Sequence, residues 1–431
     1  MSTRGAERAP GRSRLVRTRL GTVTGSTVVA LLACAGVDAS ASATPGSPGA
    51  GRRVKETAAV SLGDSFISGE AGRWQGNAPI AETTNTDMWG TDRAWTCAFG
   101  GCWKDPREVY GNTYEDPSTG KNNGCHRSDV AEIKSAVFPV NAEVNYACSG
   151  AVTDNVLPTA AGGTSFKGEW PQADQLRGLA RQKTVKLIQL SVSGNDLGFS
   201  SIIKSCITTY LTPGRDCWKN WDWQVKELLA GEVPRKVKAT VEQIRRVMRE
   251  EGYQDGDYVF ALQSYPSPVP LSSAYRYPDS SLGLASERYR IGGCPFHDSD
   301  TNWARHTLVP EIAAMLERVA RETGIGYLDL QWAFDGHGVC DRAARQPTQA
   351  NSELHPVPAR DAEWMRFLSW GIVHPQGQEE ESFHPNSYGQ KALGKCLSEF
   401  YARAQNTRRP MYECLNTPGR GEEGMHVEPL G

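Results

Sequence analysis

The stretch from Ala58 to Gly72, AAVSLGDSFISGEAG, is the strongest constraint on the fold of this chain. Its first five residues are mostly apolar and show no alternating polar face, which predicts a strand buried on both sides. The run stops at Gly63-Asp64-Ser65, where the glycine allows a sharp turn. Ser65 is therefore expected at the carboxyl end of a buried strand, where ligands bind in open α/β sheets. We interpret Ser65 as a candidate nucleophile; the alternative is that Asp64 or Ser65 only caps the next helix.

Strand patterns alternate with helical patterns along the chain. Five apolar runs that predict strands begin near residues 57, 142, 185, 258 and 325, and amphipathic runs between them predict helices. This alternation favours a parallel sheet covered on both faces. We therefore predict an α/β fold with a flavodoxin-like, doubly wound, five-stranded parallel sheet flanked by helices, and with long irregular insertions at about 73–124 and 333–383.

The first insertion is rich in tryptophan, with Trp74, Trp89, Trp95 and Trp103. Because long irregular segments inside compact domains are usually functional, these side chains are candidates for a lid or a substrate-contacting wall. The alternative, which we favour for most of them, is a satellite core stapled by a disulfide.

The amino-terminal region has the three parts of a secretory signal. A basic stretch precedes a short apolar run at residues 28–37, and Ala41-Ser42-Ala43 offers a cleavage site. We predict a signal peptide over 1–43, a flexible linker over 44–53, one catalytic domain over 54–414 and a disordered tail over 415–431. The protein is then secreted; the alternative is a lipid anchor on Cys34.

The cysteines agree with export. Eleven occur, and ten remain without Cys34, an even number suited to disulfides. Pairing between neighbours predicts five bridges: Cys97–Cys102, Cys125–Cys148, Cys206–Cys217, Cys294–Cys340 and Cys396–Cys414. A structural zinc site is disfavoured, because no Cys-x-x-Cys or His-Glu-x-x-His occurs. The net charge of −2 implies neither a nucleic acid nor an anionic membrane surface as partner.

Two further strand ends carry residues that suit the chemistry of a serine nucleophile. Ser149-Gly150 follows the second predicted strand, and Gly194-Asn195-Asp196 follows the third. In a parallel sheet these ends meet Ser65 at one edge. A serine nucleophile needs donors for the oxyanion that it creates. The candidates are the backbone N–H groups of Ser65 and Gly150 and the side-chain amide of Asn195. Taken alone, Gly150 would indicate only a tight turn, and Asn195 only a helix N-cap or an Asx turn.

The serine also needs a base, and histidine suits this role near neutral pH. We choose His384, which directly precedes Pro385 and the last amphipathic helix, so that this helix can hold it against the sheet. His374 is the runner-up.

These four blocks together resemble the SGNH, or GDSL-type, hydrolase superfamily. Its marker residues are Ser, Gly, Asn and His on four separated blocks, matched here by Ser65, Gly150, Asn195 and His384. Phe66 replaces the leucine of the GDSL motif. The order and separation of the blocks agree over residues 57–400. The context NYACSGA around the second block resembles actinobacterial secreted esterases, lipases and phospholipases of this superfamily.

The resemblance also implies a third catalytic residue. Members of the superfamily have Asp three residues before the histidine, and Glu381 stands there in this chain. Glu381 would orient the imidazole of His384 and stabilise its protonated form. Some relatives use a backbone carbonyl instead, and this alternative stays open.

The resemblance implies a secreted esterase- or lipase-like enzyme that cleaves carboxylic esters through an acyl-enzyme. We expect no cofactor and no metal, a small-molecule or lipid ester as substrate, no stable membrane insertion and a monomer. One alternative is an acyltransferase with the same site, acting on a natural product or glycan. Another is a non-catalytic carbohydrate- or lipid-binding module.

Overall fold

The structure, a computed structural model, describes residues 55–78, 91–98, 101–115, 122–212, 215–347, 356–369 and 377–430. The predicted signal peptide, the linker and Cys34 lie outside these residues, as do Trp89 and His374. Over the described ranges, no helix has both the length and the apolar character that crossing a membrane requires.

The five predicted strands form the centre of one parallel sheet. In sequence order they are β1 (Thr57–Gly63), β4 (Ala142–Asn145), β5 (Thr184–Ser191), β6 (Val259–Gln263) and β7 (Gly326–Asp329). Their spatial order is β4-β1-β5-β6-β7, which is the 2-1-3-4-5 order of flavodoxin-like folds. The predicted fold class is thereby confirmed, and the order of the strands reverses between β1 and β5.

Two strands beyond the predicted five extend the sheet to seven. β8 (Met411–Leu415) pairs parallel to β7, and β9 (His426–Pro429) pairs antiparallel to β8. The prediction of a disordered tail after Cys414 is therefore wrong. Met425 and Val427 are each only 2 % exposed, so this polar segment is held in place by two apolar anchors. A separate hairpin joins β2 (Trp95–Ala98) to β3 (Gly101–Lys104).

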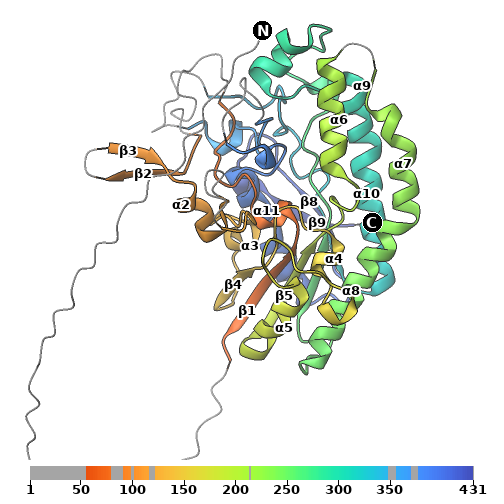
Figure 1. The fold of residues 1–431 in the computed structure, drawn as a ribbon. Helices are drawn as coiled ribbons and strands as arrows, with labels where there is room; N and C mark the ends of the chain where they lie inside the picture. The colour runs from red at the N-terminus through yellow and green to blue at the C-terminus, as the bar shows by residue number, and fades with distance from the viewer. Residues whose placement is uncertain are drawn as a thin grey trace, which may run out of the picture. The chain divides into compact units, whose positions relative to one another are not determined.

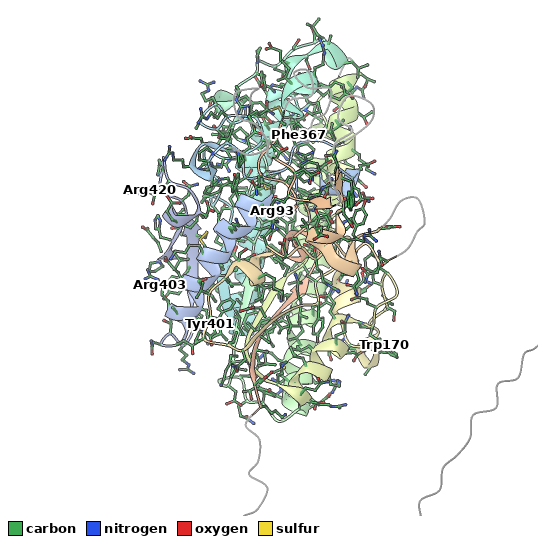
Figure 2. All side chains as sticks on the ribbon, turned by 90° about the vertical axis from the view of Figure 1, so that its left-hand side faces the viewer. Arg93, Trp170, Phe367, Tyr401, Arg403 and Arg420 are labelled. Carbon is green, nitrogen blue, oxygen red and sulfur yellow. A yellow bond between two sulfur atoms is a disulfide. The ribbon has the colours of Figure 1, made fainter. Side chains whose placement is uncertain are left out.

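Helices cover both faces of the sheet (Figure 1). One layer contains α8 (Glu232–Glu250), which contacts both α5 (Gln172–Gln182) and α10 (Val309–Thr323); the other contains α3 (Glu132–Ser135) and α11 (Ser387–Ala404), which pack together. The helices are α1 (Ser65–Ser68), α2 (Arg107–Tyr110), α3 (Glu132–Ser135), α4 (Thr153–Val156), α5 (Gln172–Gln182), α6 (Phe199–Leu211), α7 (Trp218–Ala230), α8 (Glu232–Glu250), α9 (Asp298–Trp303), α10 (Val309–Thr323) and α11 (Ser387–Ala404). Phe367, in the second insertion, is fully buried, whereas Trp170 is 72 % exposed at the surface (Figure 2).

Four of the five predicted disulfides are present: Cys125–Cys148, Cys206–Cys217, Cys294–Cys340 and Cys396–Cys414. The side chains of the fifth pair lie outside the described part, although Cys97 and Cys102 face each other in the β2–β3 register. Several disulfides in one domain are typical of proteins in an oxidising, extracellular environment.

The carboxyl ends of β1 and β5 approach each other very closely at Gly63. Its φ is +138°, and a Cβ there would lie 1.9 Å from the carbonyl oxygen of Ser191. The side chain of Gln172 accepts from the Gly63 N–H at 2.6 Å and donates to its carbonyl at 2.8 Å. The next N–H, of Asp64, donates to Ser191 at 3.0 Å. Only glycine fits this turn, which brings the end of β1 beside the end of β5.

The carboxyl-terminal segment offers a direct test of its packing. We expect Met425→Ala to lower the free energy of unfolding by about 2–5 kcal/mol, because it empties a buried site. Glu428→Ala, at an exposed position of the same segment, should change it by less than about 0.5 kcal/mol. Denaturant unfolding of the two variants measures both values. Equal stability of the two would show that the segment does not pack on the domain.

Candidate active site

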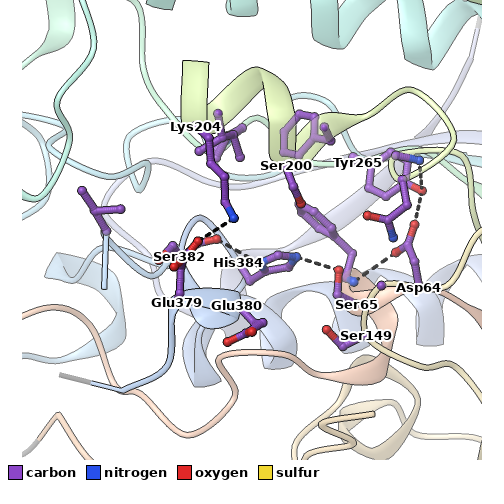
Figure 3. Close-up of a pocket in the computed structure, with 18 of the residues that line it drawn as sticks. Asp64, Ser65, Ser149, Ser200, Lys204, Tyr265, Glu379, Glu380, Ser382 and His384 are labelled. Carbon is purple, nitrogen blue, oxygen red and sulfur yellow. Dashed lines mark hydrogen bonds and ion pairs between the residues drawn. The ribbon is translucent and has the colours of Figure 1, made fainter. Parts of the chain in front are cut away.

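Ser65 opens the short helix α1 directly after the turn that ends β1. The carboxylate of Asp64 accepts from the N–H of Phe66 at 3.1 Å and so caps this helix. Ser65 Oγ instead lies 2.7 Å from Nε2 of His384 (Figure 3). Of the two interpretations of this turn, capping therefore belongs to Asp64, and the serine hydroxyl is in contact with an imidazole.

His384 is fixed by backbone contacts on both sides. Its carbonyl accepts from the N–H of Arg366 at 2.5 Å, and Pro385 forms an antiparallel bridge with Met365. Asn386 caps α11 by accepting from the N–H groups of Tyr388 and Gly389. The imidazole is thus held between a bridged loop and the start of a buried helix.

The carboxylate of Glu381 does not contact the imidazole of His384, and this part of the prediction is wrong; the contact between the two residues is the backbone bond from the N–H of His384 to the carbonyl of Glu381, at 3.2 Å. Nδ1 of His384 lies 2.9 Å from the backbone oxygen of Ser382. The carboxylate of Glu381 is 1 % exposed and takes other donors: Tyr110 Oη at 2.7 Å, Trp74 Nε1 at 2.9 Å and the N–H of Gln378 at 2.9 Å. The carboxylate points toward the first insertion because two long side chains there donate to it. The group next to Nδ1 of this histidine is therefore a backbone carbonyl, which was the alternative to Glu381.

A cavity of about 440 Å³ opens on Ser65 and His384. It is lined by all four residues of the predicted blocks, Ser65, Gly150, Asn195 and His384. Its other walls are mainly apolar and come from α6, α10 and the second insertion: Phe199, Ile203, Ile207, Val309, Ile312 and Leu368. At the same cavity, Lys204 pairs with Glu379 at 2.8 Å, and the two side chains are 68 % and 46 % exposed (Figure 3).

The tryptophans of the first insertion do not line this cavity where the structure describes them. Trp74 is fully buried against Glu381, and Trp103 is 47 % exposed. The side chain of Trp95 lies outside the described part. Trp74 therefore supports the alternative in which tryptophans of the first insertion are buried in a satellite core rather than in contact with a substrate.

The candidate oxyanion donors come from three strand ends at one edge of the sheet. Nδ2 of Asn195 donates to the carbonyl of Ala151 at 2.9 Å, which ties the third block to the turn that contains Gly150. The φ of Gly150 is +86°, a conformation that favours glycine. Asn195 has a second amide hydrogen in addition to the one used by Ala151.

Tyr265 joins these strand ends, and our sequence analysis did not single it out. Its hydroxyl donates to Asp64 at 2.6 Å and accepts from the N–H of Gly194 at 3.1 Å. Burial raises the pKa of Asp64 to about 7, although the bond from Tyr265 opposes this shift. Tyr265 lies two residues beyond β6, so the rule that functional residues gather at strand ends could have found it.

Burial also affects the candidate base, His384. Burial lowers the pKa of its imidazole, while the negative charge of Glu70 and the hydrogen bond to the carbonyl of Ser382 partly oppose this shift. Glu70 itself pairs with His126 at 2.8 Å, and both side chains are almost completely buried. Neither Glu70 nor His126 was among the predicted site residues.

A metal centre gains no support from the described residues. Cys206, Cys217 and Asp300 are the one group there whose ligand atoms lie within 4.8 Å of one another. The two cysteines form a disulfide with each other, which makes their sulfur atoms poor metal ligands.

Comparisons with known proteins give distant structural similarities. No family model matches the chain, and no curated protein matches it. An extracellular lipase from Streptomyces rimosus is 18 % identical, with a TM-score of 0.44, over 78 % of this chain and 94 % of that one. A phospholipase A1 from Streptomyces albidoflavus is 17 % identical, with a TM-score of 0.43, over 78 % and 95 %. An aryl esterase from M. smegmatis is 11 % identical, with a TM-score of 0.25, over 69 % and 93 %. At these values the similarities assign no activity to this chain.

Proposed function

We propose that this protein is a secreted serine hydrolase of carboxylic esters. The observation that carries the proposal is the 2.7 Å contact between Ser65 Oγ and His384 Nε2 inside a largely apolar cavity. A hydroxyl in contact with a neutral imidazole can lose its proton as it attacks a carbonyl. The three candidate oxyanion donors at the same edge supply the second requirement of acyl chemistry.

The reaction follows from the roles of these atoms. Ser65 Oγ attacks the ester carbonyl while Nε2 of His384 takes the hydroxyl proton. The N–H groups of Ser65 and Gly150 and the amide of Asn195 stabilise the oxyanion. His384 then protonates the leaving alcohol, and the acyl group stays on Ser65. A water molecule, deprotonated by His384, releases the acid and restores the serine.

The carbonyl of Ser382 sets the tautomer that this reaction needs. Because a carbonyl can only accept, the 2.9 Å contact places the proton of the neutral imidazole on Nδ1. Nε2 is then free to accept from Ser65. The carbonyl replaces the orienting function of the carboxylate in a catalytic triad, but it carries no full charge.

Hydrolysis is favoured over the other two candidate functions. Transfer to a second alcohol would require that the two insertions exclude water from the site; the second insertion contributes to the cavity lining, but no described tryptophan of the first insertion does. A non-catalytic binding module would have no need for a serine hydroxyl in contact with a buried imidazole.

A fluorophosphonate probe tests the nucleophile and its base without a choice of substrate. We expect the probe to label Ser65 and Ser65→Ala to remain unlabelled. The reactive form contains neutral His384, so labelling should slow as the pH falls through the pKa of this imidazole. Since burial lowers that pKa from 6.5, the decrease should lie below pH 6.5. Mass spectrometry identifies the labelled residue; labelling of the cavity serines Ser149 or Ser200 instead would contradict the assignment.

Asn195 tests the oxyanion site. Asn195→Ala should lower kcat for a p-nitrophenyl ester by about 10²–10³, with a small effect on KM, because the donor acts mainly on the transition state. Asn155→Ala is a control in the neighbouring helix α4, since Asn155 is not in the cavity lining. Steady-state kinetics of the folded variants gives both constants. An Asn195→Ala enzyme with unchanged kcat would exclude this residue as a donor.

The apolar walls predict a preference for acyl chains longer than acetyl. Each buried methylene contributes about 0.8 kcal/mol, so kcat/KM should rise by up to about fourfold per carbon until the cavity is full. Ile203→Trp should reduce this increase by filling part of the cavity. Ser201→Trp places the same side chain on the exposed side of α6, outside the lining, and should keep the wild-type profile. A flat acyl-chain profile in the wild type would show that the apolar walls do not bind the acyl group.

A further inference from the structure

A second ionisable pair lies buried next to the turn of Ser65. Oε1 of Glu70 is 2.8 Å from Nδ1 of His126, and the two side chains are 0 % and 3 % exposed. Burying two charges has a desolvation penalty that the attraction between them often fails to offset. A pair of this kind is therefore weak evidence for stability, which leaves room for a role at the site.

The pair is built onto the same elements as the catalytic contact. The N–H of Glu70 donates to the carbonyl of Ser65 at 3.2 Å, so its backbone follows α1 directly. The carbonyl of His126 accepts from the hydroxyl of Ser68, in the same helix, at 3.3 Å. On the other side, Cys125 is bridged to Cys148, and its carbonyl accepts from the N–H of Ser149 at 3.2 Å. The pair thus lies between the serine block and the glycine block.

The contact with His126 keeps the Glu70 carboxylate ionised. Burial alone raises the pKa of Glu70, but the charge and hydrogen bond of His126, together with the charge of His384 and the hydroxyl of Ser149, outweigh it, so the pKa lies below its usual value. Burial likewise lowers the pKa of His126, but the charge and hydrogen bond of Glu70 outweigh this effect and raise it. Among the described residues, neither Oε2 of Glu70 nor Nε2 of His126 has a hydrogen-bond partner. The negative charge of Glu70 is therefore held mainly by His126, with a smaller contribution from the hydroxyl of Ser149.

The proposed reaction requires a negative charge close to the imidazole of His384. During the reaction its imidazole becomes positive, and in a catalytic triad a carboxylate on Nδ1 stabilises that state. Here Nδ1 faces the carbonyl of Ser382, and Glu381 is engaged by Trp74 and Tyr110. Glu70 is the carboxylate whose charge acts most strongly on the buried His384.

We propose that Glu70 is a positioning residue that stabilises the protonated form of His384 through space, and that His126 holds Glu70 in place and ionised. Orientation of the imidazole then comes from Ser382, and its electrostatic stabilisation comes from Glu70. This inference rests on the proposed function, because it assigns Glu70 a part in the same proton transfer.

Other charged groups surround the two histidines, and each acts less directly. Those near His384 are Asp64, Glu379, Glu380, Lys204 and His126. Glu379 and Lys204 are exposed and pair with each other, so solvent screens them. His126 opposes the effect of Glu70 on His384, but its contribution is the smaller one. The groups that face His126 besides Glu70 are Glu381 and Lys167, of opposite charge.

Titration of His384 in the full chain tests this proposal directly. The ring signals of ¹³C-labelled histidines are followed by NMR against pH, and His384 is assigned by the signal that His384→Asn lacks. Glu70→Gln removes the charge at constant size. We expect it to shift the titration of His384 to lower pH, with a matching shift in the acid limb of kcat/KM and about a tenfold lower kcat. Glu70→Asp keeps the charge and should restore most of both.

Glu363→Gln is the matched control. It makes the same change in another fully buried carboxylate, which accepts from Asn77 and from the N–H of Cys340, and it should leave the titration of His384 in place. If Glu70→Gln does not fold, the double variant Glu70→Gln with His126→Gln removes both charges and leaves no unpaired one. It should still shift the titration of His384 to lower pH, but by less, because His126 partly opposes the effect of Glu70.

An unchanged or upward titration of His384 in a folded Glu70 variant would overturn the proposal. So would a loss of kcat with no movement of the acid limb, since a purely structural role would give that result. The NMR titration needs no turnover. Failure of the wild type to hydrolyse any ester would therefore refute the proposed function, while the shift of His384 would still decide the role of Glu70.

Discussion

The contact between the ends of β1 and β5 at Gly63 is the constraint on which the site depends. The order of the sheet reverses between these strands, so this is where an open α/β sheet leaves a crevice at its carboxyl edge. The glycine lets Ser191 approach its backbone closely, and Gln172 satisfies both of its backbone groups. A side chain at this position would push β1 away from β5. The serine block and the asparagine block would then no longer share one cavity.

A buried polar chain strengthens the same junction. The hydroxyl of Tyr265 links the carboxylate of Asp64 to the N–H of Gly194, so the ends of β1, β5 and β6 are tied by two hydrogen bonds. Asp64 also caps α1. Polar groups that are buried and fully paired specify one arrangement more strictly than apolar packing does. This rigidity suits a serine whose distance from its base must stay within hydrogen-bond reach.

The sequence predicted what depends on local patterns. The five central strands, the four disulfides and the place of His384 before α11 follow from apolar runs, close spacing and a proline-bounded helix start. β8 and β9 were not predicted as strands, because their apolar positions are few and because β8 joins the sheet through β7, which is distant in sequence. The direction of Glu381 was also beyond reach, since Trp74 and Tyr110, some 300 residues earlier in the chain, decide it. Side-chain direction in a loop is a tertiary property, and spacing from His384 does not encode it.

The position of Glu381 explains how the loop before His384 stays ordered without a carboxylate on the imidazole. Glu381 gathers Trp74, Tyr110 and the backbone of Gln378 and is 1 % exposed, so it anchors the turn from which Ser382 presents its carbonyl. A carboxylate used in this way cannot also face Nδ1. One carboxylate therefore orders the loop, and the stabilisation of the protonated imidazole requires a negative charge on another element. Glu70 follows the nucleophile by five positions and therefore meets this need from the serine side of the cavity.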